Sequence, residues 1–362
     1  MSKKEEIKIV YAEPQDYFPE EVRRKYKLGE FAESEELKKL KAVMLGHAVA
    51  DALGVPVEFC TREELDENPV TNMRGWGSHP VAEGCWSDDT SMAIATLDSL
   101  KHNKIDYDEI MENFVLWASN NEYTPTGETF DIGRICFSAI RNYSGTDGKP
   151  ALECGLDDEN SNGNGSLMRI HPMAFYLYKK GYDYDEAINI IHKASSITHA
   201  HKRSQIACGI YMSILWELLE CPSDASVIKG LKKARRYYRT NKKDEFIHYE
   251  RILSKCTAWL DRHPEDVDEN KEVTRDEIKS GGYVVDTLEA AIWCLLTTNS
   301  YKECVLKAVN LGEDTDTVAA VAGGLAGARY GYNNIPEEWL DVLKRRDYLE
   351  SMCEEALSAW ND

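Results

Sequence analysis

The sequence predicts an all-α fold, with one domain of many helices over residues 34–362 and a short N-terminal extension over residues 1–33. Three observations favour this fold. Apolar residues recur at helical spacing in one segment after another, and the alternation typical of strands is nearly absent after residue 34. The segment 318–328 consists almost entirely of small residues, which allows neighbouring helices to approach closely. With 43% apolar residues, the chain of 362 residues can bury a core.

Composition excludes several classes of protein. The chain has 63 acidic and 43 basic residues, and its net charge of −20 disfavours nucleic-acid binding as a main role. Its ten cysteines include no Cys-x-x-Cys pair, so neither a structural zinc site nor a disulfide framework is predicted. No apolar run approaches the roughly 20 residues that cross a bilayer, and the first residues lack the apolar core of a signal peptide. We therefore expect a cytoplasmic protein without a membrane partner.

Residues 1–33 differ from the rest of the chain. The alternation at Ile7–Tyr11 suggests a short strand, after which Pro14 and Pro19 interrupt regular structure. Two interpretations remain open: a segment packed along the domain, or an extension that binds a partner or covers a site.

The first helix of the domain is predicted from an N-cap at Ser34 to Gly54, where Pro56 prevents its continuation. Glu58 follows between two apolar residues, so its carboxylate either reaches water or points into a site. Residues 61–86 contain closely spaced glycines and prolines and are predicted to be a loop that frames a site.

Two acidic clusters stand at predicted helix starts. Ser87, Asp88 and Asp89 begin one helix, and a second cluster, Asp314, Asp316 and Thr317, begins the small-residue helix. Either cluster alone is explained by helix capping. Adjacent aspartates repel each other, however, and two clusters of hard oxygen donors together predict a shared site for divalent cations.

A helix is predicted over residues 107–120, followed by a turn-rich loop that contains Asp131. Asp131 either meets a cationic group of a substrate or caps a helix over residues 132–143. Next, Asn162–Ser166 are predicted to open a helix that continues through Phe175. Glycines before a helix expose backbone N–H groups to an anion such as phosphate, although turn formation explains the Asn-Gly pairs equally well.

The later chain continues in helices, predicted over residues 183–196, 202–220, 290–296 and 301–310, with charged, solvated helices between 222 and 280. His199 lies at the corner between the first two. It either points into a site or is a structural histidine.

The order of the motifs resembles that of the ADP-ribosylglycohydrolases of the dinitrogenase-reductase-activating type, over about residues 36–335. Six motifs carry the resemblance: Gly54–Phe59 (GVPVEF), Trp86–Thr90 (WSDDT), Gly163–Arg169 (GNGSLMR), Thr198–His201 (THAH), Tyr283–Leu288 (YVVDTL) and Gly312–Thr317 (GEDTDT). The resemblance implies an all-helical domain with a central binuclear Mg²⁺ or Mn²⁺ site that cleaves ADP-ribose from a modified side chain.

The resemblance also implies roles for individual residues. The implied metal ligands are Ser87, Asp88, Asp89, Asp314, Asp316 and Thr317, with Ser87 in place of the more usual threonine. Asp89 or Asp316 is expected to accept the proton of the attacking water, and Glu58 to bind or position the substrate. The substrate-binding residues expected are Asp131 at guanidinium, Asn164, Gly165, Ser166 and His199 at the diphosphate and ribose, and Tyr283 at adenine.

Asp131 favours arginine as the modified residue, since relatives that act on ADP-ribosyl-serine or on the polymer tend to have glycine there. The main hypothesis is therefore a hydrolase of ADP-ribosyl-arginine on proteins. The alternative is an immunity-type protein whose residues 1–33 also bind an ADP-ribosyltransferase toxin. A catalytically silent relative is disfavoured because the acidic residues are intact.

Overall fold

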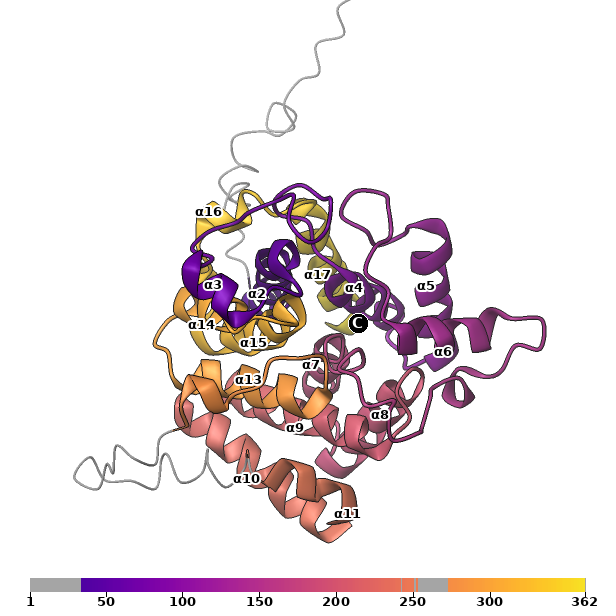
Figure 1. Cartoon of the computed structure of the whole chain (residues 1–362). Helices are drawn as coiled ribbons and strands as arrows, with labels where there is room; N and C mark the ends of the chain where they lie inside the picture. Colours follow the sequence, from indigo (N-terminus) through magenta and orange to yellow (C-terminus); the bar gives the residue numbers. More distant parts are fainter. Residues whose placement is uncertain (1–33, 242, 251, 253–272, 362) are drawn as a thin grey trace, which may run out of the picture. The chain divides into compact units, whose positions relative to one another are not determined.

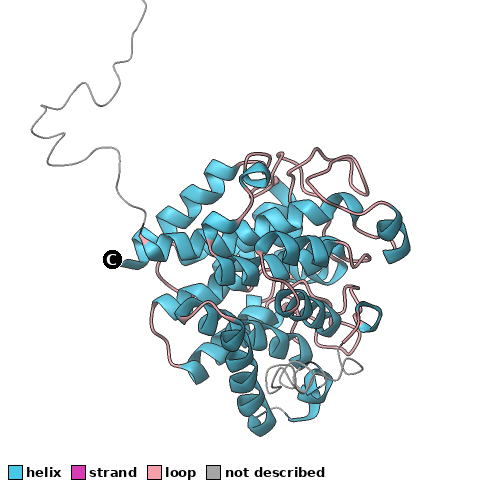
Figure 2. Ribbon diagram, turned by 90° about the vertical axis from the view of Figure 1, so that its left-hand side faces the viewer, coloured by secondary structure: helices cyan, strands magenta, loops and turns pink. Residues whose placement is uncertain are grey.

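The computed structural model describes residues 34–241, 243–250, 252 and 273–361. Every regular element in this part of the chain is a helix (Figure 2), which confirms the all-α prediction. The α-helices are α2 (Glu35–Gly54), α3 (Arg62–Glu67), α4 (Asp88–Leu100), α5 (Tyr107–Asn120), α6 (Arg134–Ser144), α7 (His171–Lys179), α8 (Tyr184–Ser196), α9 (Lys202–Glu220), α10 (Asp224–Asn241), α11 (Lys243–Phe246), α13 (Val284–Leu296), α14 (Tyr301–Val309), α15 (Thr315–Tyr330), α16 (Glu337–Leu340) and α17 (Arg346–Asn361). The strand predicted at Ile7–Tyr11 lies outside the described residues.

Local capping explains many of the helix bounds. The Asp106 carboxylate accepts a hydrogen bond from the backbone N–H of Glu109 at 3.1 Å and starts α5, which ends at Asn121 in the left-handed conformation. Asp183 caps α8 in the same way. The bounds predicted for α5 and α9 are confirmed, and α2 ends at Gly54 as expected.

The prediction of an unbroken loop over residues 61–86 is wrong, because α3 lies inside it. Thr61 and Glu64 form a capping box, in which the Thr61 hydroxyl accepts from the Glu64 backbone N–H and the Glu64 carboxylate accepts from the Thr61 backbone N–H. This pair stabilises a helix of six residues despite the breakers that follow it.

The helix predicted to open at Asn162–Ser166 begins only at His171. The preceding backbone is engaged elsewhere: the Asn164 N–H donates to the Gly282 carbonyl at 3.1 Å, and the Val284 N–H donates to the Asn162 carbonyl at 3.0 Å. Pro172 then suits the first turn of α7, where its missing N–H costs no hydrogen bond. The glycine turn is therefore tied to the segment before α13 rather than to a helix start.

α13 also begins earlier than the predicted Ala290, at Val284. In the charged region, α10 and α11 are helical as predicted, while residues 253–272 lie outside the described chain.

The small-residue helix α15 packs against α13, α14, α9 and α4 (Figure 1). The backbone of α15 is also in direct contact with the backbone of α2. A Cβ atom added to Gly327 would lie 1.9 Å from the Ala42 carbonyl oxygen, and one added to Gly54 would lie 2.3 Å from the Asp316 Cα. The predicted close approach is confirmed, and it brings the end of α2 against the start of α15.

Gly327→Ala is expected to destabilise the protein by about 3 kcal/mol, because the new methyl group must displace a backbone carbonyl rather than a side chain. Urea unfolding gives the change directly. Gly133→Ala is the matched control, since its Cβ would meet nothing within 4 Å and its φ is −57°. Equal midpoints for both variants would contradict the tight α2–α15 contact.

One segment is long and apolar enough by composition to cross a membrane, namely Glu35–Val57, with mean hydropathy 1.4 over its best window. The prediction that no such segment exists is wrong. All of that window is buried inside the protein, because α2 is a central helix whose polar face is also covered.

Candidate metal centre

The start of α4 presents the first acidic cluster in a buried setting. Ser87 is the N-cap, and its hydroxyl donates to the Asp89 carboxylate (Oδ2) at 3.0 Å. Ser87, Asp88 and Asp89 are all buried. The helix start thus holds two carboxylates where solvent cannot hydrate them.

The start of α15 brings the second cluster against the first. The Thr317 hydroxyl donates to the same Asp89 Oδ2 at 3.2 Å, so residues 228 positions apart in the chain are in direct contact. Asp314 occupies the N-cap position, but its side chain makes no capping hydrogen bond and instead accepts from the Asn164 amide at 2.8 Å. Capping alone therefore does not account for Asp314, and the predicted meeting of the clusters is confirmed.

Asp51 on α2 is a further member of the cluster that the sequence analysis missed. Its carboxylate accepts from the backbone N–H groups of Ser87 (2.9 Å) and Thr90 (3.1 Å) and from the Thr90 hydroxyl (2.6 Å). It thereby fixes the start of α4 from another helix. The only signal in the sequence was an aspartate set among alanines and a leucine in the apolar second half of the helix.

Burial in the helical core dominates the electrostatics. It raises the pKa values of Asp88, Asp89 and Asp316 well above the usual range, and neighbouring carboxylates raise them further. Burial likewise raises the pKa of Asp51 to about 6. So many adjacent carboxylates repel one another unless positive charge is present.

The donor set fits a divalent cation of the hard, oxygen-seeking kind. Asp51, Asp89 and Asp316 place one oxygen each within 4.8 Å of one another, and Glu58, Asp314 and Asp316 form a second such group that shares Asp316. Among the described residues, Asp89 Oδ1 and Asp316 Oδ2 are buried without a hydrogen-bond partner. Orphaned buried carboxylate oxygens are costly, and a bound cation would satisfy them.

Ser87, Asp88 and Thr317, the other expected ligands, lie beside these groups but are not members of them. Asp88 and Thr317 line the adjacent cavity, whereas the Ser87 hydroxyl is engaged with Asp89. Their roles as ligands remain predictions.

A cavity of about 220 Å³ opens beside the acidic clusters. Its lining residues come from six separate stretches of the chain: Glu58, Asp88, Asp131, Gly133, Arg134, Ile135, Cys136, Gly163, Asn164, Gly165, Met168, His199, Asp314 and Thr317. Acidic side chains and the glycine turn thus share one cavity, as a substrate with both cationic and anionic groups requires.

Glu58 and Asp131 lie close together in this cavity. The Glu58 carboxylate is buried, and burial raises its pKa to about 7, which decides between the two interpretations in favour of a site. Asp131 does not cap α6, because Gly133 is the N-cap and makes no side-chain bond. Asp131 has a φ of 54°, in the left-handed region that aspartate tolerates better than most residues.

His79 is a second residue that the sequence analysis missed. Its Nε2 lies 2.5 Å from Glu58 Oε2, and the two residues and Asp131 place one nitrogen or oxygen atom each within 4.8 Å of one another. The hydrogen bond to Glu58 raises the pKa of His79. A lone histidine in a glycine-rich loop gives no sequence signal for this contact.

His199 also lines the cavity, next to the glycine turn. A Cβ on Gly165 would lie 2.9 Å from the His199 ring, so only glycine fits there. Arg169 donates to the Thr198 hydroxyl at 2.8 Å, and that hydroxyl lies 3.0 Å from His199 Nδ1. Because the hydroxyl accepts from Arg169 and its one proton can be donated to Nδ1, this arrangement favours the tautomer of His199 with the proton on Nε2.

Burial lowers the pKa of His199 to about 3, so the imidazole is neutral and presents Nε2–H as a hydrogen-bond donor. Nε2 lies 3.4 Å from the position of a Cβ added to Gly163, which places this donor at the turn. The geometry suits an oxygen acceptor in the cavity.

Two expected substrate-binding residues lie outside the cavity lining. The Ser166 hydroxyl is fully buried and accepts from the Ser195 hydroxyl at 2.9 Å, so it points into the core and not at the cavity. Tyr283 pairs with Gly163 in an isolated bridge, and its hydroxyl accepts from Arg203 at 3.2 Å. The position of Tyr283 next to the turn leaves its predicted role open.

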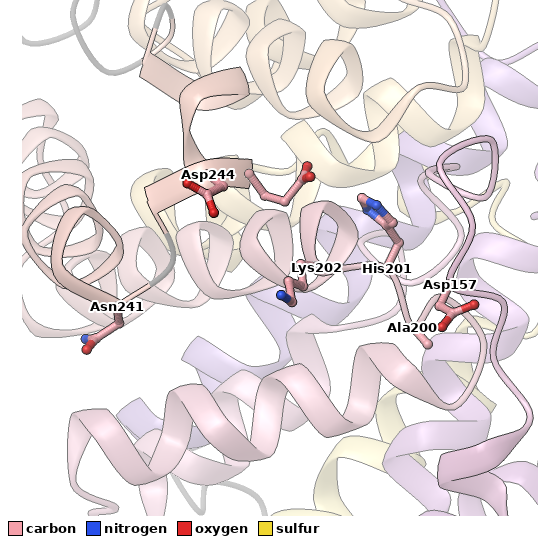
Figure 3. A pocket seen from close by; sticks show the side chains of 7 residues that line it. Asp157, Ala200, His201, Lys202, Asn241 and Asp244 are labelled. Atoms are coloured by element: carbon pink, nitrogen blue, oxygen red, sulfur yellow. The ribbon is translucent and has the colours of Figure 1, made fainter.

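The two histidines of the Thr198–His201 motif line different cavities. His201 caps α9 and lines a separate hollow of about 550 Å³ with Asp157, Lys202 and Asp244 (Figure 3). That hollow contains none of the residues of the acidic clusters. The chemistry is therefore assigned to the smaller cavity.

The model of the ADP-ribosylglycohydrolase family matches residues 32–362. The chain belongs to the ADP-ribosylglycohydrolase family. The resemblance of the six motifs is thereby confirmed over most of the chain, and the acidic cavity lies in the matched region.

Relatives in the family include enzymes with defined substrates. The chain is 32% identical over 324 residues to an ADP-ribosylarginine hydrolase of Serratia proteamaculans, covering 89% of this chain and 80% of that protein. It is 31% identical to the ADP-ribosyl-[dinitrogen reductase] glycohydrolase of Rhodospirillum rubrum, covering 83% and 88%. A solved ADP-ribosylglycohydrolase-related protein complex contains a chain with a TM-score of 0.70 and 27% identity, covering 90% and 99%.

The raised carboxyl pKa values of this family member predict a specific pH dependence. A group whose folded-state pKa is raised stabilises the protein fully below its unfolded-state value, and that contribution is lost as pH rises through the folded-state value. For Asp51 and Glu58, these folded values are about 6 and about 7. Without divalent cations, the melting temperature should fall between about pH 5 and pH 7.5.

Differential scanning calorimetry with chelator checks this expectation, and Mg²⁺ at a concentration well above its Kd should restore stability at pH 7.5. A melting temperature that rises over this pH range without metal would contradict the arrangement described for the carboxylates.

Proposed function

We propose that this glycohydrolase releases ADP-ribose from arginine side chains of modified proteins. The observation that carries the proposal is a single cavity lined both by paired carboxylates, Glu58 and Asp131, and by a neutral histidine with a glycine turn. Arginine carries a planar cation and ADP-ribose a diphosphate, so the two kinds of lining group complement the two ends of the substrate. The names of the relatives from Serratia proteamaculans and Rhodospirillum rubrum point the same way.

The proposal assigns the following roles to individual residues. Asp131 and Glu58 accept hydrogen bonds from the guanidinium N–H groups. His199 Nε2–H and the turn at Asn164 and Gly165 donate to the ribose and phosphate oxygens. These contacts orient the bond between the ribose carbon and the arginine nitrogen within the acidic clusters.

Hydrolysis adds a water oxygen to the ribose carbon as the bond to the guanidine nitrogen breaks. Asp89 or Asp316 accepts a proton from that water. A proton is returned to the leaving nitrogen, so that ADP-ribose and unmodified arginine are the products.

We assign two divalent cations, Mg²⁺ or Mn²⁺, to the acidic clusters, with Asp89, Asp314 and Asp316 among the ligands, while Glu58 is left to the substrate. When bound, such ions supply positive charge that orients the ribose hydroxyls and lowers the pKa of water. A cytoplasmic location, expected from the sequence, belongs to the same proposal.

The test is a comparison of acceptors. Purified protein with Mg²⁺ should release ADP-ribose from a protein modified on arginine at least about 30-fold faster than from one modified on serine. Chromatography of the released ADP-ribose measures both rates. Equal rates, or a preference for serine, would refute the assignment of arginine.

A second proposal concerns residues 1–33, which lie outside the described residues. The family model matches residues 32–362 and so assigns no role to the preceding segment. The alternative hypothesis is that this segment binds an ADP-ribosyltransferase toxin. Deletion of residues 1–33 should then abolish complex formation with a transferase and leave hydrolysis intact, whereas retention of the complex would exclude this role.

A further inference from the structure

Two large aromatic side chains project from the protein: Phe59, which follows Glu58 in the chain, and Trp76, which lies three residues before His79. Phe59 is 70% exposed and Trp76 is 74% exposed. Both have left-handed backbones, with φ values of 65° and 59°. Bulky residues rarely adopt this conformation, and side chains this exposed gain little packing that would offset its cost. The structure of the domain alone therefore gives no reason for aromatic residues at these positions.

The two residues lie on loops that are locked together, residues 56–59 and 75–79, which we call the paired loops. The Ser78 N–H donates to the Pro56 carbonyl at 2.9 Å, and the Ser78 hydroxyl donates to the Glu58 carbonyl. A Cβ on Gly77 would lie 1.7 Å from the Pro56 oxygen, so the backbones are in direct contact. The paired loops thus form one unit.

The inner side of the paired loops belongs to the cavity. Glu58 lines it, and His79 bonds to Glu58 at 2.5 Å. The His79 ring also packs between Phe59 and Phe130, with ring centroids 6.2 and 5.2 Å away. One short unit therefore carries both the proposed guanidinium-binding carboxylate and two exposed aromatic side chains.

The direction of the substrate follows from the proposed function, on which this inference rests. With the diphosphate at the glycine turn and the guanidinium at Glu58 and Asp131, the arginine side chain leaves the cavity at the paired loops. The polypeptide that bears the arginine must then pass close to Phe59 and Trp76.

We propose that Phe59 and Trp76 form a docking surface for the modified polypeptide and contact an apolar side chain near the ADP-ribosylated arginine. Exposed aromatic residues next to a substrate's exit path are well suited to this role, because they bury large areas with few rotatable bonds. The docking surface distinguishes a protein substrate from the same modified arginine as a free amino acid.

The experiment compares these two substrates for the double variant Phe59→Asn/Trp76→Asn. Asparagine tolerates a positive φ, so the loops retain their backbone. The expected result is a fall in kcat/KM of about 10-fold or more for arginine-modified protein, with free ADP-ribosyl-arginine hydrolysed within about 2-fold of wild type. Unchanged hydrolysis of the free compound also shows that the site is folded.

Ile247→Asn is the matched control, because Ile247 is also an apolar residue of high exposure (68%) and lies on a different element, the 3₁₀ helix Ile247–Tyr249. It should change neither rate. Equal losses on both substrates would show that the aromatic rings contact the ADP-ribose instead. No loss on either substrate would show that these rings do not contact the substrate. Both results overturn this inference alone, whereas wild-type protein inactive on both substrates would refute the proposed function itself.

Discussion

Asp316→Asn and Asp89→Asn are each expected to lower kcat/KM for ADP-ribosyl-arginine protein at least about 100-fold, because loss of a group that only orients a metal ligand already costs 10- to 100-fold. Both residues belong to the buried group that also contains Asp51, and each has an unpartnered carboxylate oxygen. The amide has almost the same shape as the carboxylate, so the loss reports charge rather than packing.

The same variants should become more stable without metal. Removal of one buried negative charge relieves repulsion by the remaining carboxylates, which at pH 8 is expected to raise the free energy of unfolding by about 1 kcal/mol or more. Activity and stability then change in opposite directions. Urea unfolding in chelator measures the second effect.

Asp98→Asn is the matched control on the same helix, α4. Asp98 pairs with Lys101 at 2.8 Å and accepts from the Tyr123 hydroxyl at 2.7 Å, near the surface. This variant should keep its activity and be slightly less stable. A metal-free Asp316→Asn protein that is also less stable than wild type would contradict the account of repulsion in the site.

Asp131→Asn is expected to lower kcat/KM for ADP-ribosyl-arginine about 30-fold or more, since it removes the charge that pairs with guanidinium in a partly desolvated cavity. Asparagine keeps the shape of the side chain and tolerates the φ of 54°. Any slow release from ADP-ribosyl-serine should not fall in parallel, because serine offers no cation to Asp131.

Released ADP-ribose from the two substrates gives the ratio of specificities. Glu128→Gln, in the same loop but exposed to solvent, should leave both rates unchanged. A parallel loss on arginine and serine substrates would assign Asp131 to the catalytic steps common to both rather than to recognition of arginine.

Helices with strong local signals were predictable from the sequence. Periodic apolar residues place α5 and α9 correctly, and the meeting of Asp89 with Thr317 follows from two acidic helix starts that need a shared positive charge. The late start of α7 was not predictable in this way, because the turn before it is held by hydrogen bonds to a segment more than 100 residues away.

The missed site residues share a physical cause. Asp51 fixes a helix start that lies 36 residues further along the chain, and His79 meets Glu58 only because Gly77 packs on Pro56. Neither contact leaves a periodic or local trace in the sequence. The expected contact of Ser166 with the substrate is not found. Its motif suggests exposure at a turn, but its hydroxyl lies in the core and accepts from Ser195.

The central claim is that the acidic clusters hold divalent cations needed to release ADP-ribose from arginine. The most direct measurement is ADP-ribose release from arginine-modified protein by wild type and by Asp88→Ala/Asp89→Ala, each first with chelator and then with Mg²⁺ restored. The account predicts release only by wild type with Mg²⁺. Release in chelator, or full activity of the double variant, would contradict it.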